Sequence, residues 1–106
     1  MEFRRKCDAA LEKLRNRLLE LGDQSDFEVE GMGEKLELVF EEPEPARFVI
    51  SPNSPVRQIW ISALSTSFKL SWSDEVNDFV LEKSGETLNQ VMSRILTQQL
   101  GTAVRV

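Results

Sequence analysis

Two stretches of helically spaced apolar residues stand at the ends of this 106-residue chain, and the residues between them mostly alternate between apolar and polar. In the first stretch, residues 3–22, apolar side chains recur every three or four positions up to a glycine, the residue type that commonly follows a helix. In the second, residues 88–100, the same spacing ends at Gly101, and Ser84 or Thr87 is placed to cap the first turn. These patterns predict one amphipathic helix at each end of the chain.

The segment between the helices contains about six short runs with the two-residue alternation of β-strands. These runs cover residues 26–30, 35–40, 47–50, 58–63, 68–72 and 78–83. A Gly-Met-Gly turn joins the first two runs. Two proline-containing stretches, residues 41–46 and 51–55, flank the third run. Because proline cannot donate a ladder hydrogen bond, we expect neither stretch to lie inside a central strand.

This order of elements predicts an α+β fold, a two-layer sandwich with two helices packed on one face of an antiparallel sheet of about six strands. The connections are too short for parallel crossovers, and two helices with one apolar stripe each can cover only one sheet face. A composition of 41% hydrophobic and 29% charged residues is typical of a single globular domain, here residues 1–106. No apolar run approaches the roughly 18 residues of a membrane-spanning helix, so we expect no membrane segment.

Trp60 is the residue that departs from this pattern. In a strand over residues 58–63, Ile59 and Ile61 share the apolar face, whereas Trp60 falls on the other face with Gln58 and Ser62. Since the helices cover only the apolar face, the tryptophan is predicted to lie on the open face. Two explanations remain at this point: an aromatic ring partly covered by a following loop, or an exposed surface for a partner.

Catalytic chemistry has little support in the sequence. The chain contains no histidine and no tyrosine, and its five glycines form neither a dinucleotide-binding nor a phosphate-binding motif. Residues 23–34 have the length of a calcium loop, but Phe27 and Glu28 replace an oxygen ligand and the turn glycine. The single cysteine, Cys7, lies on the apolar stripe of the first helix and is expected to be a buried thiol. We therefore expect a protein that is not an enzyme.

The charge is distributed unevenly along the chain. Residues 1–19 carry six Lys or Arg and three Asp or Glu, a net charge of +3, whereas residues 20–44 carry ten acids and one lysine, a net charge of −9. Such an acidic segment repels nucleic acids and anionic lipids and favours cations or a basic protein surface. The acids around the first turn and first strand are either a solvated run that protects a sheet edge or a shallow all-oxygen site for hard cations. They are Glu20, Asp23, Asp26, Glu28 and Glu30.

Three motifs together resemble the frataxin family, with the bacterial members as the nearest match. They are "PVRQIWIS" at residues 55–62, "FKLSW" at residues 68–72 and "DFVLEKSGETL" at residues 78–88. The resemblance extends over nearly the whole chain and implies the same architecture as the pattern of elements. It also implies that Trp60 projects from the open sheet face, that Gln58 belongs to the same surface, and that Arg57 and Lys69 contribute to partner binding.

The resemblance further implies a function in iron–sulfur cluster assembly. Frataxins bind a cysteine desulfurase together with its scaffold protein, modulate sulfur transfer, and bind iron weakly through acids of the first helix and first strand. Glu20, Asp23, Asp26, Glu28 and Glu30 occupy that region here. The implied ligand is Fe²⁺ or Fe³⁺ on the surface, with no organic cofactor, and the implied protein is a bacterial, cytoplasmic monomer.

Two interpretations follow from the resemblance. In the first, the chain is an iron-binding regulator of the desulfurase–scaffold complex or, in a variant of this interpretation, an adaptor with no physiological iron role. In the second, it is a metal-delivery protein in which the carboxylates perform the central chemistry. The positions of the first helix that are expected to be exposed include basic residues, whereas bacterial frataxins are usually acidic there; the basic residues are Arg4, Arg5, Lys6, Lys13, Arg15 and Arg17. This difference favours the interpretation as a protein-binding regulator.

Overall fold

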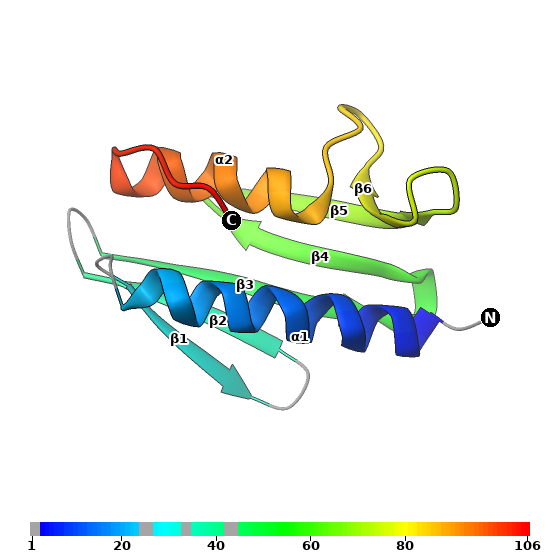
Figure 1. Cartoon of the computed structure of the whole chain (residues 1–106), viewed down its shortest axis with the longest axis horizontal. Helices are drawn as coiled ribbons and strands as arrows, with labels where there is room; N and C mark the ends of the chain where they lie inside the picture. The colour runs from blue at the N-terminus through cyan, green and yellow to red at the C-terminus, as the bar shows by residue number, and fades with distance from the viewer. Residues whose placement is uncertain (1–2, 24–26, 33–34, 42–44) are drawn as a thin grey trace.

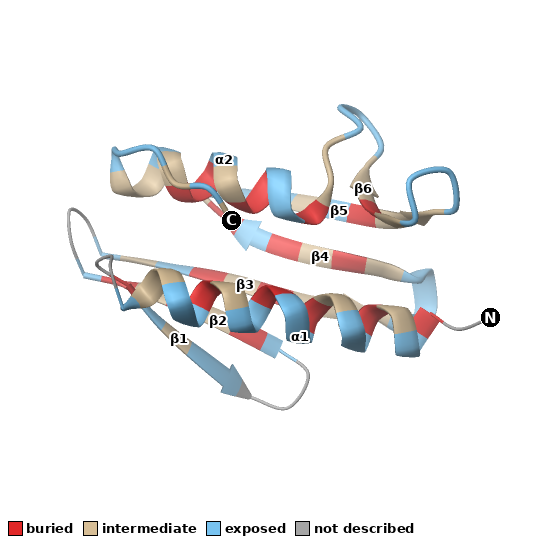
Figure 2. Ribbon diagram, in the orientation of Figure 1, coloured by how far each residue is buried: buried red, intermediate tan, exposed pale blue. Residues whose placement is uncertain are grey.

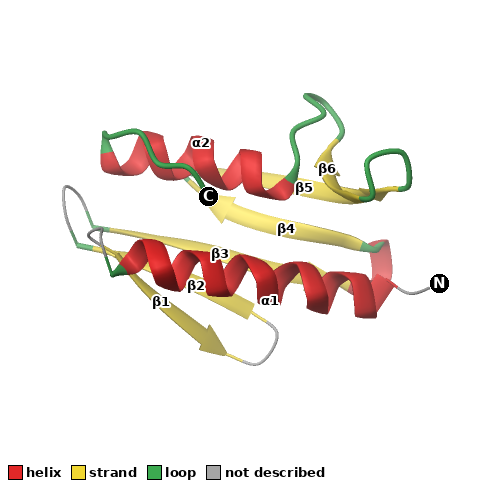
Figure 3. Ribbon diagram, viewed as in Figure 1, coloured by secondary structure: helices red, strands yellow, loops and turns green. Residues whose placement is uncertain are grey.

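The computed structural model describes residues 3–23, 27–32, 35–41 and 45–106 of the chain. Its elements follow the predicted order of one helix, six strands and one helix, which confirms the α+β class (Figures 1 and 3). In chain order they are α1 (Phe3–Gly22), β1 (Phe27–Met32), β2 (Lys35–Phe40), β3 (Ala46–Asn53), a 3-10 turn (Ser54–Val56), β4 (Gln58–Ala63), β5 (Thr66–Ser73), β6 (Asp78–Leu81) and α2 (Leu88–Leu100).

The six strands form one antiparallel sheet in which spatial order equals sequence order, β1-β2-β3-β4-β5-β6. Both helices lie on the same face of this sheet, with α1 nearest β1 and α2 nearest β6 (Figure 1). This arrangement confirms the predicted two-layer sandwich. It also leaves the opposite face, called the open face below, without a covering layer among the described residues.

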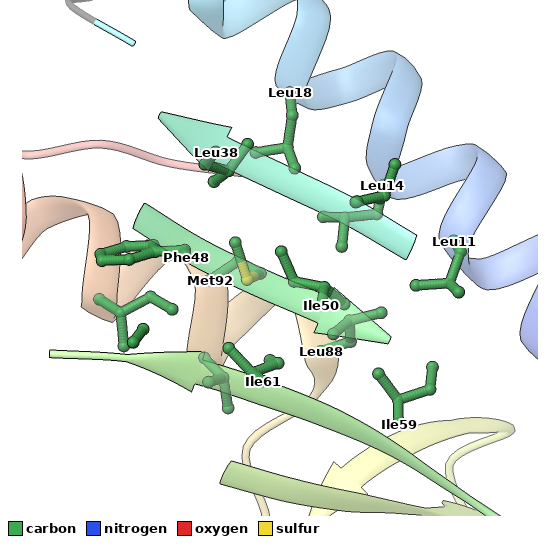
Figure 4. Packing of buried hydrophobic residues seen from close by; sticks show 14 of the residues in the cluster. Leu11, Leu14, Leu18, Leu38, Phe48, Ile50, Ile59, Ile61, Leu88 and Met92 are labelled. Atoms are coloured by element: carbon green, nitrogen blue, oxygen red, sulfur yellow. The ribbon is translucent and has the colours of Figure 1, made fainter. Parts of the chain in front are cut away.

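The alternation of each strand decides which side chains reach the helices. In β4, Ile59 and Ile61 are 0% and 1% exposed. They belong to the same buried cluster as Ile50 of β3 and the leucines of α1, among them Leu14 and Leu18, so that helix and sheet share one core (Figures 2 and 4). Burial of each such side chain contributes about 1.5–3 kcal/mol, and this apolar layer therefore holds the two helices on the sheet. Cys7 is 1% exposed within the same layer, as predicted for a structural thiol.

Local signals account for the ends of α2. The Thr87 hydroxyl accepts a hydrogen bond from the Gln90 backbone N–H, and the Gln90 side chain accepts one from the Thr87 N–H, forming a capping box. Thr87 is thus the N-cap, one of the two predicted candidates. At the other end, Gly101 adopts a left-handed conformation with φ of 75°, which glycine reaches without the penalty of a Cβ atom.

The prediction that the second proline stretch lies outside a central strand is wrong at Pro52. Strand β3 continues to Asn53, and Pro52 pairs with Ile59 of β4. Among the described residues, the pairing of β3 with β2 ends at Ile50, and β4 is the strand that pairs with β3 beyond it. Within that part of the chain, Pro52 lies past the end of the β2 pairing, where its missing N–H interrupts no ladder bond to β2.

The residues after α2 return along the two helices. Val104 and Val106 are half-buried against the core, and the Val106 N–H donates a 2.9 Å hydrogen bond to the Ser93 hydroxyl of α2. From α1, the Arg17 guanidinium donates a 2.8 Å bond to the Arg105 carbonyl. The chain end thus lies between the helices, as Figure 1 shows. Among the described residues, no helix has the length and apolarity needed to cross a membrane.

An ion pair joins the connection between β6 and α2 to α2 itself, and it shifts the pKa of the acid that takes part in it. Arg94 of α2 donates two 2.9 Å hydrogen bonds to the Glu86 carboxylate, and the Ser84 hydroxyl donates a third at 2.8 Å. The bonds from Arg94, followed by the bond from Ser84, hold the pKa of Glu86 below its ordinary value of 4.5. A lowered folded-state pKa contributes stability above the ordinary value, and this contribution is lost as the pH falls through the folded value.

We predict that Glu86→Gln lowers the free energy of unfolding at neutral pH by about 0.5–1 kcal/mol, a small effect because both partners are partly exposed. The difference from wild type should shrink as the pH falls through the lowered folded-state pKa of Glu86, because the wild-type carboxylate then becomes protonated as well. Urea unfolding at neutral pH and at a pH below that pKa measures it. Glu82→Gln, an exposed acid on the same connection, is the matched control. An effect of equal size at both pH values would contradict this account.

Candidate functional site

The open face of the sheet is polar around one aromatic ring. Register places Trp60 of β4 opposite Ser51 of β3 and Lys69 of β5, with Gln58 and Ser62 two positions away along its own strand. Small hydroxyl side chains therefore flank the indole on two sides. The ring is half-buried, but it is absent from the aromatic and aliphatic side chains that pack against the core. The structure thus places Trp60 on the open face, as predicted.

Hydrogen bonds hold the indole in one orientation. Trp60 Nε1 donates a 2.9 Å bond to Gln58 Oε1, and Gln58 Nε2 donates a 3.1 Å bond to Ser71 Oγ on β5. The ammonium of Lys69 lies 4.8 Å from the centre of the Trp60 ring, a cation–π distance. We call these four residues, Gln58, Trp60, Lys69 and Ser71, the Trp60 surface. The polar side-chain atoms of Gln58, Trp60 and Ser71 are hydrogen-bonded to one another, while part of the indole remains accessible to a partner.

Arg57 lies at the margin of this surface. It follows the 3-10 turn Ser54–Val56 and adopts a left-handed conformation with φ of 54°, after which β4 begins at Gln58. Its side chain is exposed. The same turn exposes Val56, whose relative exposure is 52%. A cationic and an aliphatic side chain are therefore available next to the Trp60 surface, at the end of β4.

Sequence patterns did not identify Ser71 as part of this site. The hydrogen bond from Gln58 to Ser71 joins residues 13 positions apart, and it depends on the register that pairs these two residues. Once the turn between β4 and β5 is assigned, counting outward from it along both strands pairs Gln58 with Ser71. Leu64 and Ser65 adopt left-handed conformations there without being glycines, so the usual glycine signal of such a turn is missing.

The second tryptophan has similar local chemistry on the other face. Trp72 Nε1 donates a 2.8 Å bond to Asp74 Oδ1, and the Lys6 ammonium lies 4.1 Å from its ring centre. Trp72, however, contacts Phe79 edge to face, with 5.3 Å between ring centres, and packs against the core. The predicted face is confirmed, although the ring is half-buried rather than enclosed because it lies at the margin of the helical layer.

The predicted acidic residues are distributed over two parts of the molecule. Glu20 and Asp23 are exposed at the end of α1, in the helical layer. Glu28 and Glu30 are exposed on β1 and point to the open face, because Phe27 and Val29 take the core side. Asp26 falls outside the described residues. The five predicted acids therefore do not form one patch in the part of the chain that the structure describes.

The open-face acids lie on an edge strand. Glu30 pairs directly with Glu37 of β2, and the Glu37 carboxylate is 3.6 Å from the Arg47 guanidinium of β3. Within residues 3–23, 27–32, 35–41 and 45–106, no group of three or more Asp, Glu, Cys or His side chains is arranged to hold a metal ion. Oxygen ligands suit Fe²⁺ chemically, but the described carboxylates offer separate contacts instead of a closed coordination shell.

Comparison with known proteins gives a consistent assignment. The family model described as a frataxin-like domain matches residues 1–102. An iron–sulfur cluster assembly protein CyaY from Pseudomonas fluorescens is 26% identical over 92 residues, covering 87% of this chain and 84% of that protein. A protein of the same name from Pseudomonas putida is 31% identical over 86 residues, covering 79% and 76%.

A solved structure, the frataxin from Psychromonas ingrahamii, superimposes with a TM-score of 0.82 at 21% identity. The match covers 98% of this chain and 93% of that one. At this identity the match supports the fold alone, and the family assignment rests on the sequence comparisons.

The position of Trp60 predicts a small effect of its removal on stability. We expect Trp60→Ala to change the free energy of unfolding by less than about 1 kcal/mol, because the ring packs against no core residue. Ile61→Ala, at the next position but on the helix-covered face, should cost about 2–4 kcal/mol. Urea denaturation of both variants measures the difference. Comparable losses in the two variants would show that Trp60 has a structural role.

Proposed function

The chain belongs to the frataxin family, and we propose that it acts in iron–sulfur cluster assembly as a regulator that binds a cysteine desulfurase together with its scaffold protein. The relatives' shared name, iron–sulfur cluster assembly protein, supports the process. The observation that carries the binding role is the indole of Trp60, held by hydrogen bonds on the open face.

The Trp60 surface has the physical properties of a binding anchor. Aromatic side chains dominate the energetics of many protein interfaces because they bury a large apolar area with few rotatable bonds. Here the bond to Gln58 already restricts the ring, so less conformational entropy is lost when a partner covers it. The flanking serines leave the ring edge accessible. Arg57 and Lys69 supply positive charge at the margin for an acidic or carbonyl-bearing contact.

The proposed role requires no catalysis by this chain. The full sequence lacks histidine and tyrosine, and its one thiol, Cys7, is 1% exposed on the sheet-facing side of α1. A sulfur-transfer step needs an accessible thiolate, which a buried cysteine does not provide. We therefore propose that the protein modulates sulfur transfer by binding alone. The bacterial relatives support a cytoplasmic site of action.

The acidic edge supports a basic partner surface. Glu28 and Glu30 of β1 lie on the same face of the sheet as Trp60, and residues 20–44 together carry a net charge of −9. A negative edge on the same face as the aromatic anchor, separated from it by β2 and β3, attracts a basic surface before contact and orients it toward the ring. We propose that the desulfurase meets this edge through Lys or Arg side chains, with the Trp60 surface providing most of the binding free energy.

Iron binding is proposed as weak and secondary. Glu20, Asp23, Asp26, Glu28 and Glu30 supply oxygen ligands, and the described ones are exposed and separated, so an Fe²⁺ ion keeps most of its water ligands. The same separation favours a second candidate function, a frataxin-fold adaptor with no physiological iron role. The basic residues of α1 point in the same direction because they reduce the attraction of cations to the helical layer.

We predict that Trp60→Ala lowers the affinity for a desulfurase–scaffold complex by about thirtyfold or more, corresponding to a lost interface anchor. Trp72→Ala is the matched control, since it removes a half-buried indole that also carries a hydrogen bond and a nearby lysine, but from the helix-covered face. Isothermal calorimetry below the melting transition of both variants measures the affinity. Equal losses in the two variants would overturn the assignment of the interface to the open face.

For iron, we predict a dissociation constant of about 0.1 mM or weaker. Mn²⁺, a paramagnetic substitute, should broaden the backbone amide signals of residues 28 and 30 first, and Glu28→Gln combined with Glu30→Gln should reduce that broadening. Mg²⁺ at the same concentration serves as the diamagnetic control. Broadening confined to other parts of the chain would contradict the proposed carboxylates, and micromolar affinity would contradict the absence of a closed site.

A further inference from the structure

A groove runs between the two helices on the face opposite the Trp60 surface. It has a volume of about 780 Å³, and its lining includes Lys6, Lys13 and Arg17 of α1, Trp72 of β5, Asn89 of α2 and Val106 at the chain end. We call it the inter-helix groove. It is independent of the proposed partner surface. Both helices lie on one face of the sheet (Figure 1), whereas the strand register places Trp60 on the other face.

The cations form one row along the groove. Positions 6, 13 and 17 are separated by seven and four residues, so they lie on one stripe of α1, next to the apolar stripe that faces the sheet. One acid, Asp78, is among the lining residues, and its Oδ1 accepts a 2.7 Å bond from the Phe79 N–H. Lys13 is exposed and makes no hydrogen bond or ion pair among the described residues. Arg17 is ion-paired with Glu20 at 3.2 Å, so the positive charge that the groove presents to a partner is mainly that of Lys6 and Lys13.

An extended chain already occupies one end of this groove. Arg17 of α1 donates to the Arg105 carbonyl at 2.8 Å, and on the other side Thr97 of α2 accepts a 2.9 Å bond from the Val104 N–H. Side chains of both helices thus bind the backbone of an irregular segment. The lining of the groove also includes Lys13, Lys6 and Trp72, with Ala9, Ala10 and Leu88 as its apolar part.

From this geometry we propose that the inter-helix groove binds an acidic, extended segment of a partner protein. Along a helix, Lys13 and Arg17 are separated by about 6 Å and Lys6 and Lys13 by about 10 Å. Alternate side chains of an extended peptide are about 6.6 Å apart, so carboxylates two or three residues apart match the row. A single small anion could contact only one or two of these cations.

A peptide fits better than a nucleic acid. Binding of single strands relies on base stacking against exposed aromatic faces, but the Lys6 ammonium lies 4.1 Å from the centre of the only aromatic ring in the groove lining. The aliphatic lining suits the intervening side chains of a peptide instead. The net charge of −5 also disfavours a polyphosphate chain, whose charge density far exceeds that of an acidic peptide.

The test uses a fluorescein-labelled octapeptide of alternating glutamate and alanine, with a glutamine–alanine peptide as the neutral control. Fluorescence anisotropy should show binding of the acidic peptide that weakens with salt. Lys13→Gln should lower its affinity by about two- to fivefold and Lys13→Glu by about tenfold. Arg15→Gln and Arg15→Glu are the matched controls, because Arg15 is an exposed cation of the same helix outside the groove lining. These controls should leave binding nearly unchanged.

Backbone amide shifts should map the peptide to Lys6, Lys13 and Asn89, and unchanged thermal melting of the Lys13 variants would exclude unfolding as the cause. If Arg15→Glu lowered the affinity for the acidic peptide as much as Lys13→Glu does, the binding would be unspecific electrostatic attraction, and the proposal would be overturned. Tighter binding of a single-stranded oligonucleotide of equal charge would assign the groove to nucleic acid instead. Self-association in sedimentation that Lys13→Glu abolishes would assign it to a second copy of the chain.

Discussion

The burial of one face of the sheet under two helices determines most other features of this molecule. Each strand alternates, so every side chain directed to the helices must be apolar, and every neighbouring side chain is turned to the open face. In β4 this rule places Ile59 and Ile61 in the core at 0% and 1% exposure and leaves Trp60 between them on the other side. A slip of one residue would bury Gln58 and expose both isoleucines, so the same energy that stabilises the fold also fixes the position of the indole.

The elements that depend on periodicity were predictable from the sequence, whereas features that depend on register were not. Both helices, the end of α2 at Gly101 and the six strands follow from spacing and turn residues alone. The predicted role of Gly22 as the residue after the first helix is wrong, because Gly22 is the last residue within α1 and does not adopt a positive φ. The position of Pro52 does not, because the length of each neighbouring strand decides whether its missing N–H matters. The bond from Gln58 to Ser71 similarly requires the pairing of β4 with β5, which includes a turn without glycine. The sequence also predicts which carboxylates are available as oxygen ligands. Only the fold shows that Glu20 lies in the helical layer whereas Glu28 lies on the open face of the sheet.

The distribution of charge adds a second level of organisation. The acids Glu28 and Glu30 lie at the β1 edge of the open face, and the cations Lys6 and Lys13 line a groove in the helical layer. The low net charge of −5 conceals this separation, because opposite charges on different faces cancel in the sum but not in the local field. Screening over about 10 Å at moderate salt keeps the two regions electrostatically distinct, so each can attract a partner of opposite sign.

The two tryptophans show why a site must be argued from its surroundings. Each has its Nε1 bonded to a side chain two residues away, each has a lysine ammonium within 5 Å of its ring centre at 4.8 and 4.1 Å, and each is half-buried. Local chemistry therefore does not distinguish them. The two rings differ in their tertiary contacts. Trp72 has Phe79 and the helical layer beside it, whereas Trp60 has serines beside it and no covering element among the described residues. A ring that is held by hydrogen bonds, without apolar packing, buries most of its apolar surface only when another molecule covers it. The free energy of that burial therefore contributes to binding and not to folding.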